Sequence, residues 1–166
     1  MVNDIIKNLH KGKSLLMNIS QEQYCDKSIP PYYSSIGGHM RHILDMYNCI
    51  FIGYPLGIVN LTNRERSINV ETIPDYGITY LDSIVNHLYN LKKTDLDLPI
   101  QIIDDLGGGT YSVTSTLGAV LAQAQSHAIH HYATIGYMMH HLGVVLDDDS
   151  FGLNPTTPKV KVVNRG

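Results

Sequence analysis

The chain has 166 residues, a net charge of −3 and the composition of an ordinary globular protein, so we expect a single domain over residues 1–166. It has no run of lysine and arginine, which argues against nucleic acid or an anionic membrane as a partner. We also expect no signal peptide and no membrane span. The two cysteines lack a Cys-x-x-Cys motif, which favours free thiols and a cytoplasmic protein.

The hydrophobic pattern predicts four helices in chain order. The first covers residues 3–18, and the second follows a cap at Ser34 or Ser35 and ends near residues 53–55. A long irregular connection over residues 54–71 leads to a third helix that opens at Pro74. Strand-like segments at 96–103 and 110–114 flank three glycines and predict a hairpin. Ser115 caps the fourth helix, which ends at Gly143.

The expected fold is therefore all-α: a four-helix bundle with a long connection between helices 2 and 3 and a small β-hairpin before helix 4.

Five of the nine histidines lie between residues 127 and 141 of the predicted fourth helix. His127 and His131 are four residues apart, so both project from the face that carries the apolar stripe. Such a pair can bind one metal ion, and hydrogen-bonded core histidines are the alternative. His130, His140 and His141 point to other faces, and we expect them not to be ligands.

A second pair, His39 and His42, lies on the predicted second helix. His42 shares a face with small residues, whereas His39 lies nearer the centre of the apolar stripe. Helical geometry alone leaves open which of the two is a third ligand, and both could face the site.

The segments SIGGHMRHILD at 35–45 and SHAIHH at 126–131 resemble the DinB/YfiT-like superfamily of metalloenzymes. The segments VNLTNRER at 59–66 and FGLNPTT at 151–157 resemble one bacterial subgroup of it. The resemblance covers nearly the whole chain. It implies a four-helix bundle with a metal held by His42, His127 and His131. The position of His39 is usually apolar in the family, so His39 is either an outer partner of a ligand or an alternative ligand.

Relatives in this superfamily include metal-dependent hydrolases and enzymes that use low-molecular-weight thiols. Three imidazoles leave a coordination position open, as in catalytic zinc sites. The resemblance thus implies a divalent metal, zinc or nickel first and iron or manganese next, and hydrolysis or thiol-dependent transfer on a small molecule. The alternative is a non-catalytic metal-binding bundle that acts as a dimeric interaction module. An apolar flank near Tyr137 and Met138 would support a homodimer under either interpretation.

Several polar residues are candidates for supporting roles. Asp45 and Gln123, each about one turn from a candidate ligand, could orient a ligand ring or a bound water, and a surface or capping role is the alternative for Asp45. Cys49 faces the same side as His42, although a buried free cysteine in a core is common.

Arg64 and Arg66 lie in the long connection and could bind an anionic group of a substrate. The alternative for both is an ion pair with Glu65 or Glu71 that anchors the connection.

Overall fold

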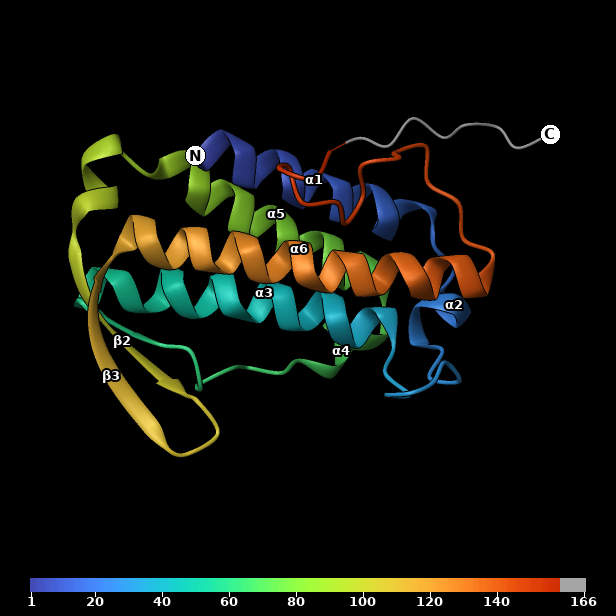
Figure 1. The fold of residues 1–166 in the computed structure, drawn as a ribbon, viewed down its shortest axis with the longest axis horizontal. Helices are drawn as coiled ribbons and strands as arrows, with labels where there is room; N and C mark the ends of the chain where they lie inside the picture. Colours follow the sequence, from blue (N-terminus) through green and yellow to red (C-terminus); the bar gives the residue numbers. More distant parts are fainter. Residues whose placement is uncertain (159–166) are drawn as a thin grey trace.

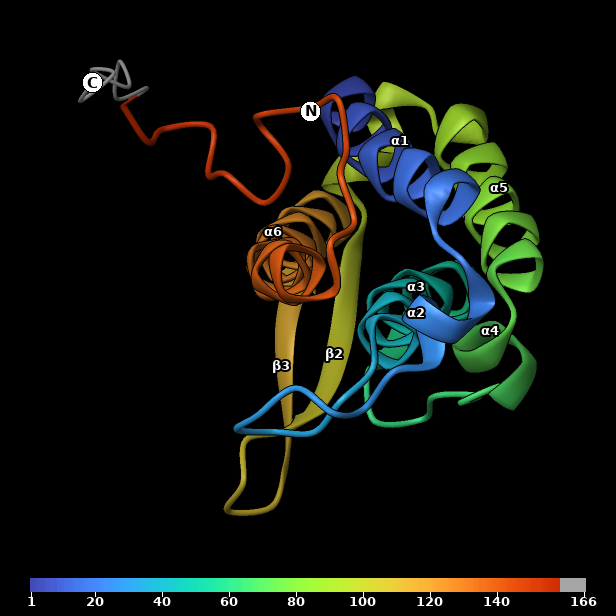
Figure 2. The same cartoon turned by 90° about the vertical axis from the view of Figure 1, so that its right-hand side faces the viewer.

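Four long helices dominate the fold in a computed structural model that describes residues 1–158 (Figure 1). They are α1 (Val2–Asn18), α3 (Ile36–Gly53), α5 (Pro74–Asn90) and α6 (Leu117–Leu142). The contacts close a ring, because α1 packs on α5 and α6, and α3 packs on the same two helices (Figure 2). The shorter helical segments are α2 (Gln21–Cys25), α4 (Ile68–Thr72), η1 (Tyr54–Leu56) and η2 (Lys93–Asp97).

The helix ends follow capping chemistry. The hydroxyl of Ser35 accepts a hydrogen bond from the backbone N–H of Gly38 at 3.0 Å and starts α3. Thr116, rather than the predicted Ser115, caps α6 by accepting from the Ala119 N–H at 3.2 Å. The strand before α6 continues through Thr116, so Ser115 lies inside that strand, opposite Ile100, and the prediction was one residue early.

The core fills the space between the four long helices. Its fully buried side chains come from every one of them and include Leu9, Ile43, Leu81 and Ile135. The apolar stripe predicted on the last helix is confirmed, since Val120, Ala124, Ile135 and Met138 are all buried.

The predicted hairpin before the last helix is confirmed as strands β2 (Pro99–Asp105) and β3 (Thr110–Thr116). Gly107 and Gly109 lie in the connecting turn with φ of 89° and 129°, which glycine adopts at little cost. The hairpin extends to one side of the helices (Figure 2).

The connection between helices α3 and α5 is not irregular, and that prediction was wrong. It contains η1, α4 and a short strand β1 (Ile58–Asn60), which pairs in parallel with β2. The protein is therefore mainly helical with a small mixed sheet in the order β1-β2-β3, rather than purely α. A strand of three residues is too short to show alternation, and its partner lies about forty residues away, with Ile58 opposite Gln101.

No helix within residues 1–158 is both long and apolar enough to cross a bilayer. The sequence also predicts an extended tail over residues 144–166, of which residues 159–166 lie outside the described part of the chain.

Candidate metal centre

Three histidines from two helices meet where α3 packs against α6. His42 comes from α3, and His127 and His131 come from successive turns of α6. One ring nitrogen from each lies within 4.8 Å of those of the other two. The ring centroids are 4.4 Å apart for His127 and His131, and 4.8 Å and 4.7 Å from His42 to these two rings. The spacing can bring three imidazole nitrogens to one ion.

Burial favours the uncharged form of all three rings. Burial, reinforced by the nearby Arg64 cation, lowers the pKa of His42 to about 4. Burial and the neighbouring histidines lower the pKa of His131 to about 3. Burial also lowers the pKa of His127, and Arg64 adds to that effect. Neutral imidazole is the form that binds a metal ion, so the protonation state suits a metal site.

His39 lies beside the group of three. Its Nδ1 is 2.8 Å from the Nδ1 of His131, and its Nε2 is 2.8 Å from the hydroxyl of Ser34. Of the two histidines between which helical geometry could not choose, His42 lies in the three-histidine group, and His39 contacts Nδ1 of His131 instead. A hydrogen bond of this kind fixes the orientation of a ligating ring.

Arg64 contacts the outer nitrogen of His42, which is Nδ1, whereas Nε2 of the same ring contacts His127. Its Nη1 lies 3.0 Å from His42 Nδ1, and its Nε donates to the carbonyl oxygen of Leu61 at 3.0 Å. Leu61 follows β1 and donates its N–H to the Ile103 carbonyl of β2, and β1 itself contacts α3. Arg64 forms no ion pair with Glu65 or Glu71 among the described residues, so the predicted anchoring role was wrong.

Arg66 forms neither a side-chain hydrogen bond nor an ion pair within residues 1–158 and is exposed. Sequence reasoning missed the contact between Arg64 and His42 because nothing in the local pattern of residues 59–66 points to α3.

Asp45 does not bond to a histidine. It is 1 % exposed, and it accepts from Arg41 at 3.1 Å and from the hydroxyl of Tyr80 at 3.3 Å. Burial raises its pKa, and the Arg41 cation works against that shift. Gln123 is exposed on the turn before His127.

Cys49 is buried outside the three-histidine group. Its thiol donates to the carbonyl oxygen of Asn63 at 3.4 Å, and burial raises its pKa. Both cysteines of the chain are free.

A cavity of about 390 Å³ opens on two of the three histidines. Its charged groups are arranged around Glu71, which accepts from Lys27 and from Arg41 Nε, both at 3.1 Å. The lining residues are Lys27, Tyr32, Tyr33, Ser34, Ser35, Gly38, His39, Arg41, His42, Glu71 and His131. A small molecule in this cavity would lie directly against the imidazoles.

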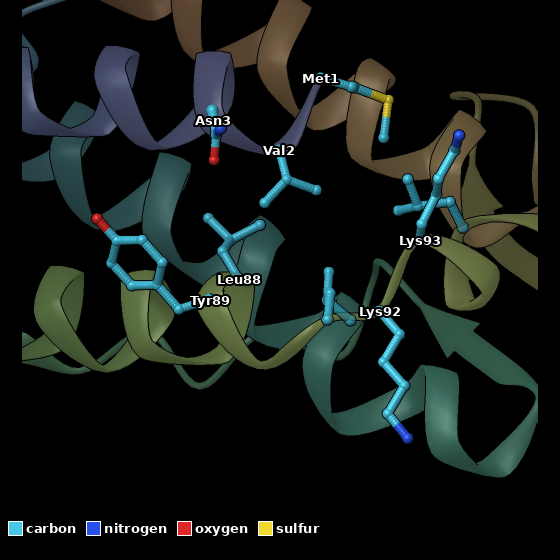
Figure 3. Close-up of a pocket in the computed structure, with 9 residues that line it drawn as sticks. Met1, Val2, Asn3, Leu88, Tyr89, Lys92 and Lys93 are labelled. Carbon is cyan, nitrogen blue, oxygen red and sulfur yellow. The ribbon is translucent and has the colours of Figure 1, made fainter.

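A second pocket of about 440 Å³ lies between the start of α1 and the end of α5 (Figure 3). Val2 and Leu88 face each other across it, and Lys92 and Lys93 lie at one end of it (Figure 3). Its lining contains no histidine, cysteine or carboxylate. It therefore offers neither metal ligands nor a general base, and the chemistry favours the histidine cavity.

The remaining histidines of α6 lie outside the group, as predicted. His130 is exposed, with its ring centroid 5.3 Å from that of His131, and His140 and His141 are exposed at the end of the helix.

Comparison with known proteins supports the fold. No protein-family model matches the sequence, and no curated protein matches it. The crystal structure of a DinB-like protein, YjoA of Bacillus subtilis, is similar with a TM-score of 0.64 and 21% identity. The similarity covers 86% of this chain and 90% of that one. At this identity the similarity concerns the fold, so the chain has the fold of a DinB-like protein, as its sequence motifs implied.

Proposed function

We propose that this chain is a metal-dependent enzyme built on a DinB-type four-helix bundle, with His42, His127 and His131 as ligands of one divalent metal. The observation that carries the proposal is the meeting of three imidazoles, two of which, those of His42 and His131, line a cavity large enough for a small molecule. A site of three histidines suits zinc or nickel first, and iron or manganese next.

A divalent metal with an open position supplies either a hydroxide at neutral pH or an activated thiolate. The residues of this chain provide the surroundings for that chemistry. His39 holds the ring of His131 through its outer nitrogen, and Ser34 holds His39 in turn. Burial keeps the imidazoles uncharged, so they do not repel a cation.

The cavity supports a polar small molecule as substrate. The wall carries the cations of Lys27 and Arg41 and the carboxylate of Glu71, which pairs with both, and Arg41 also pairs with Asp45, which is buried outside the wall. Tyr32 and Tyr33 are exposed at its edge, where they could pack against an apolar part of the ligand. We propose hydrolysis or thiol-dependent transfer as the reaction, with a low-molecular-weight thiol as cosubstrate in the second case. A homodimer and a cytoplasmic location remain predictions from the sequence.

Metal analysis of protein purified without a histidine tag tests the proposal. We expect about one divalent metal per chain, and loss of most of it in His42→Ala, His127→Ala and His131→Ala. His140→Ala is the matched control, because this histidine is exposed on the same helix as two of the ligands. Metal content unaffected by the three substitutions, or no uptake of zinc or nickel, would refute the proposal. A screen of ester, amide and thiol substrates on the loaded protein then separates hydrolysis from transfer.

A further inference from the structure

The outer nitrogen of His42 faces a group that can only donate hydrogen bonds. Arg64 Nη1 lies 3.0 Å from His42 Nδ1, and a guanidinium has no acceptor atom. Nδ1 must therefore present its lone pair to Arg64. A neutral imidazole with a lone pair on Nδ1 carries its proton on Nε2. That proton fits the next contact, because His42 Nε2 lies 2.8 Å from His127 Nε2 and can donate to it.

This tautomer leaves His42 without a nitrogen for a metal ion. The Nδ1 lone pair is bonded to Arg64, and Nε2 carries the proton. Binding through Nε2 would move the proton to Nδ1, where it would point at the N–H of Arg64. Binding through Nδ1 would require Arg64 to leave that nitrogen. Metal binding by the neutral ring, through either nitrogen, therefore requires the contact between Arg64 and His42 to break.

His131 is under no such restriction. Its outer nitrogen contacts His39, which contacts the hydroxyl of Ser34, and a hydroxyl can either donate or accept. When the hydroxyl accepts, His39 Nε2 donates to it, and His39 Nδ1 accepts from His131 Nδ1. His131 Nε2 is then free of hydrogen. Rotation of one hydroxyl is enough to reach this state, so the restriction is specific to His42.

We propose that Arg64 is a gate on the metal centre: its contact with His42 and metal binding by His42 exclude each other, and loading requires the guanidinium to swing away. The inference rests on the proposed role of His42 as a ligand. Arg64 is partly exposed and its neighbours Asn63 and Glu65 are exposed, so the guanidinium can exchange its contacts with His42 and the Leu61 carbonyl for water.

Affinity for zinc alone, and separately for nickel alone, tests the gate in chelator-treated full-length protein by competition with a chromogenic chelator. Removing the competing donor in Arg64→Ala is expected to tighten binding by roughly tenfold or more, given the strength of hydrogen bonds to charged groups. Arg64→Gln is a second variant, whose amide oxygen can accept a proton on Nδ1, and it is expected to bind at least as tightly. Arg66→Ala is the control for loss of a positive charge from the same loop, and we expect less than a threefold change.

Nitrogen-15 NMR of the imidazoles shows which ring nitrogen of His42 carries the proton, and a purely structural role of Arg64 would not change that position. The metal-free protein is expected to show His42 protonated on Nε2, with loss of this preference in Arg64→Ala. Equal or weaker binding by Arg64→Ala and Arg64→Gln while the unmodified protein binds metal would overturn the gate and leave the proposed function standing. Binding by none of the proteins would overturn both, and binding tightened equally in Arg66→Ala would replace the gate by a simple charge effect.

Discussion

The free energy of unfolding of the metal-free protein is expected to fall steeply as the pH drops below about 6.5. His42 and His131 have pKa values of about 4 and about 3 in the folded chain, against 6.5 for an ordinary histidine. Between these values the unfolded chain binds a proton at each histidine and the folded chain does not. Stability rises with pH wherever the unfolded state binds more protons, so here acidification destabilises the fold.

The magnitude follows from the same linkage. Each histidine contributes about 1.4 kcal/mol per pH unit, so the two together contribute about 3 kcal/mol per unit below the ordinary pKa. The loss at pH 5.5 would be about 3 kcal/mol, against the roughly 5–15 kcal/mol that stabilises a typical domain. The lowered pKa values of His39 and His127 act in the same direction.

Guanidinium denaturation of chelator-treated protein at pH 7.5, 6.5 and 5.5 measures this slope above the range where most carboxylates titrate. In His42→Ala the loss of stability between pH 6.5 and 5.5 is expected to shrink by about 1 kcal/mol, because one linked proton is lost. His140→Ala, which changes an exposed histidine, should leave the slope unaltered. A slope that is equal in His42→Ala and in the unmodified protein, or stability that does not change between pH 7.5 and 5.5, would refute the reasoning.

Four further predictions concern support of the site, packing and a helix cap. His39→Ala is expected to weaken zinc affinity about 10–100-fold without abolishing binding, as measured by chelator competition, and an unaltered affinity would contradict its positioning role. A Cβ on Gly37 would overlap a carbonyl oxygen of α4, so Gly37→Ala should cost about 1–3 kcal/mol in denaturant melts. Gly136 has open space around it, so Gly136→Ala should instead stabilise α6 by roughly 0.5–1 kcal/mol. A lower stability of Gly136→Ala than of the unmodified protein would contradict this prediction. Thr116→Ala should cost about 1 kcal/mol through loss of the helix cap, whereas Ser115→Ala should cost less, and the reverse order would reject the observed cap.

The sequence predicted the parts of the fold whose signals are local. The periods of the four long helices, the glycine turn of the hairpin and the αL glycine that ends α6 each depend on neighbouring residues only. Strand β1 was not predicted from the sequence, because it exists only through pairing with β2. The cap of α6 was misplaced for a related reason, since the pairing of β3 with β2 decides where the strand ends.

The residues of the candidate site also divide into those with a local signal in the sequence and those that depend on contacts between helices. The spacing of His127 and His131 made their shared face predictable from α6 alone. The family resemblance, rather than helical geometry, selected His42 over His39 as their companion. The position of His39 against His131 depends on how α3 is rotated toward α6, which the pattern of either helix leaves open.

The pairing of Asp45 with Arg41 explains how Arg64 comes to face the site. On α3, Asp45 follows Arg41 by four residues and His42 by three, so helical spacing allows either partner. A buried carboxylate is costly without an opposite charge, and Arg41 supplies that charge at 3.1 Å. Glu71 takes the other side of Arg41 at 3.1 Å. Asp45 and Glu71, the carboxylates near His42, are thus both paired with Arg41. The Nδ1 of His42 is left to Arg64, which can only donate, whereas this nitrogen of a metal-bound ring would be expected to face an acceptor.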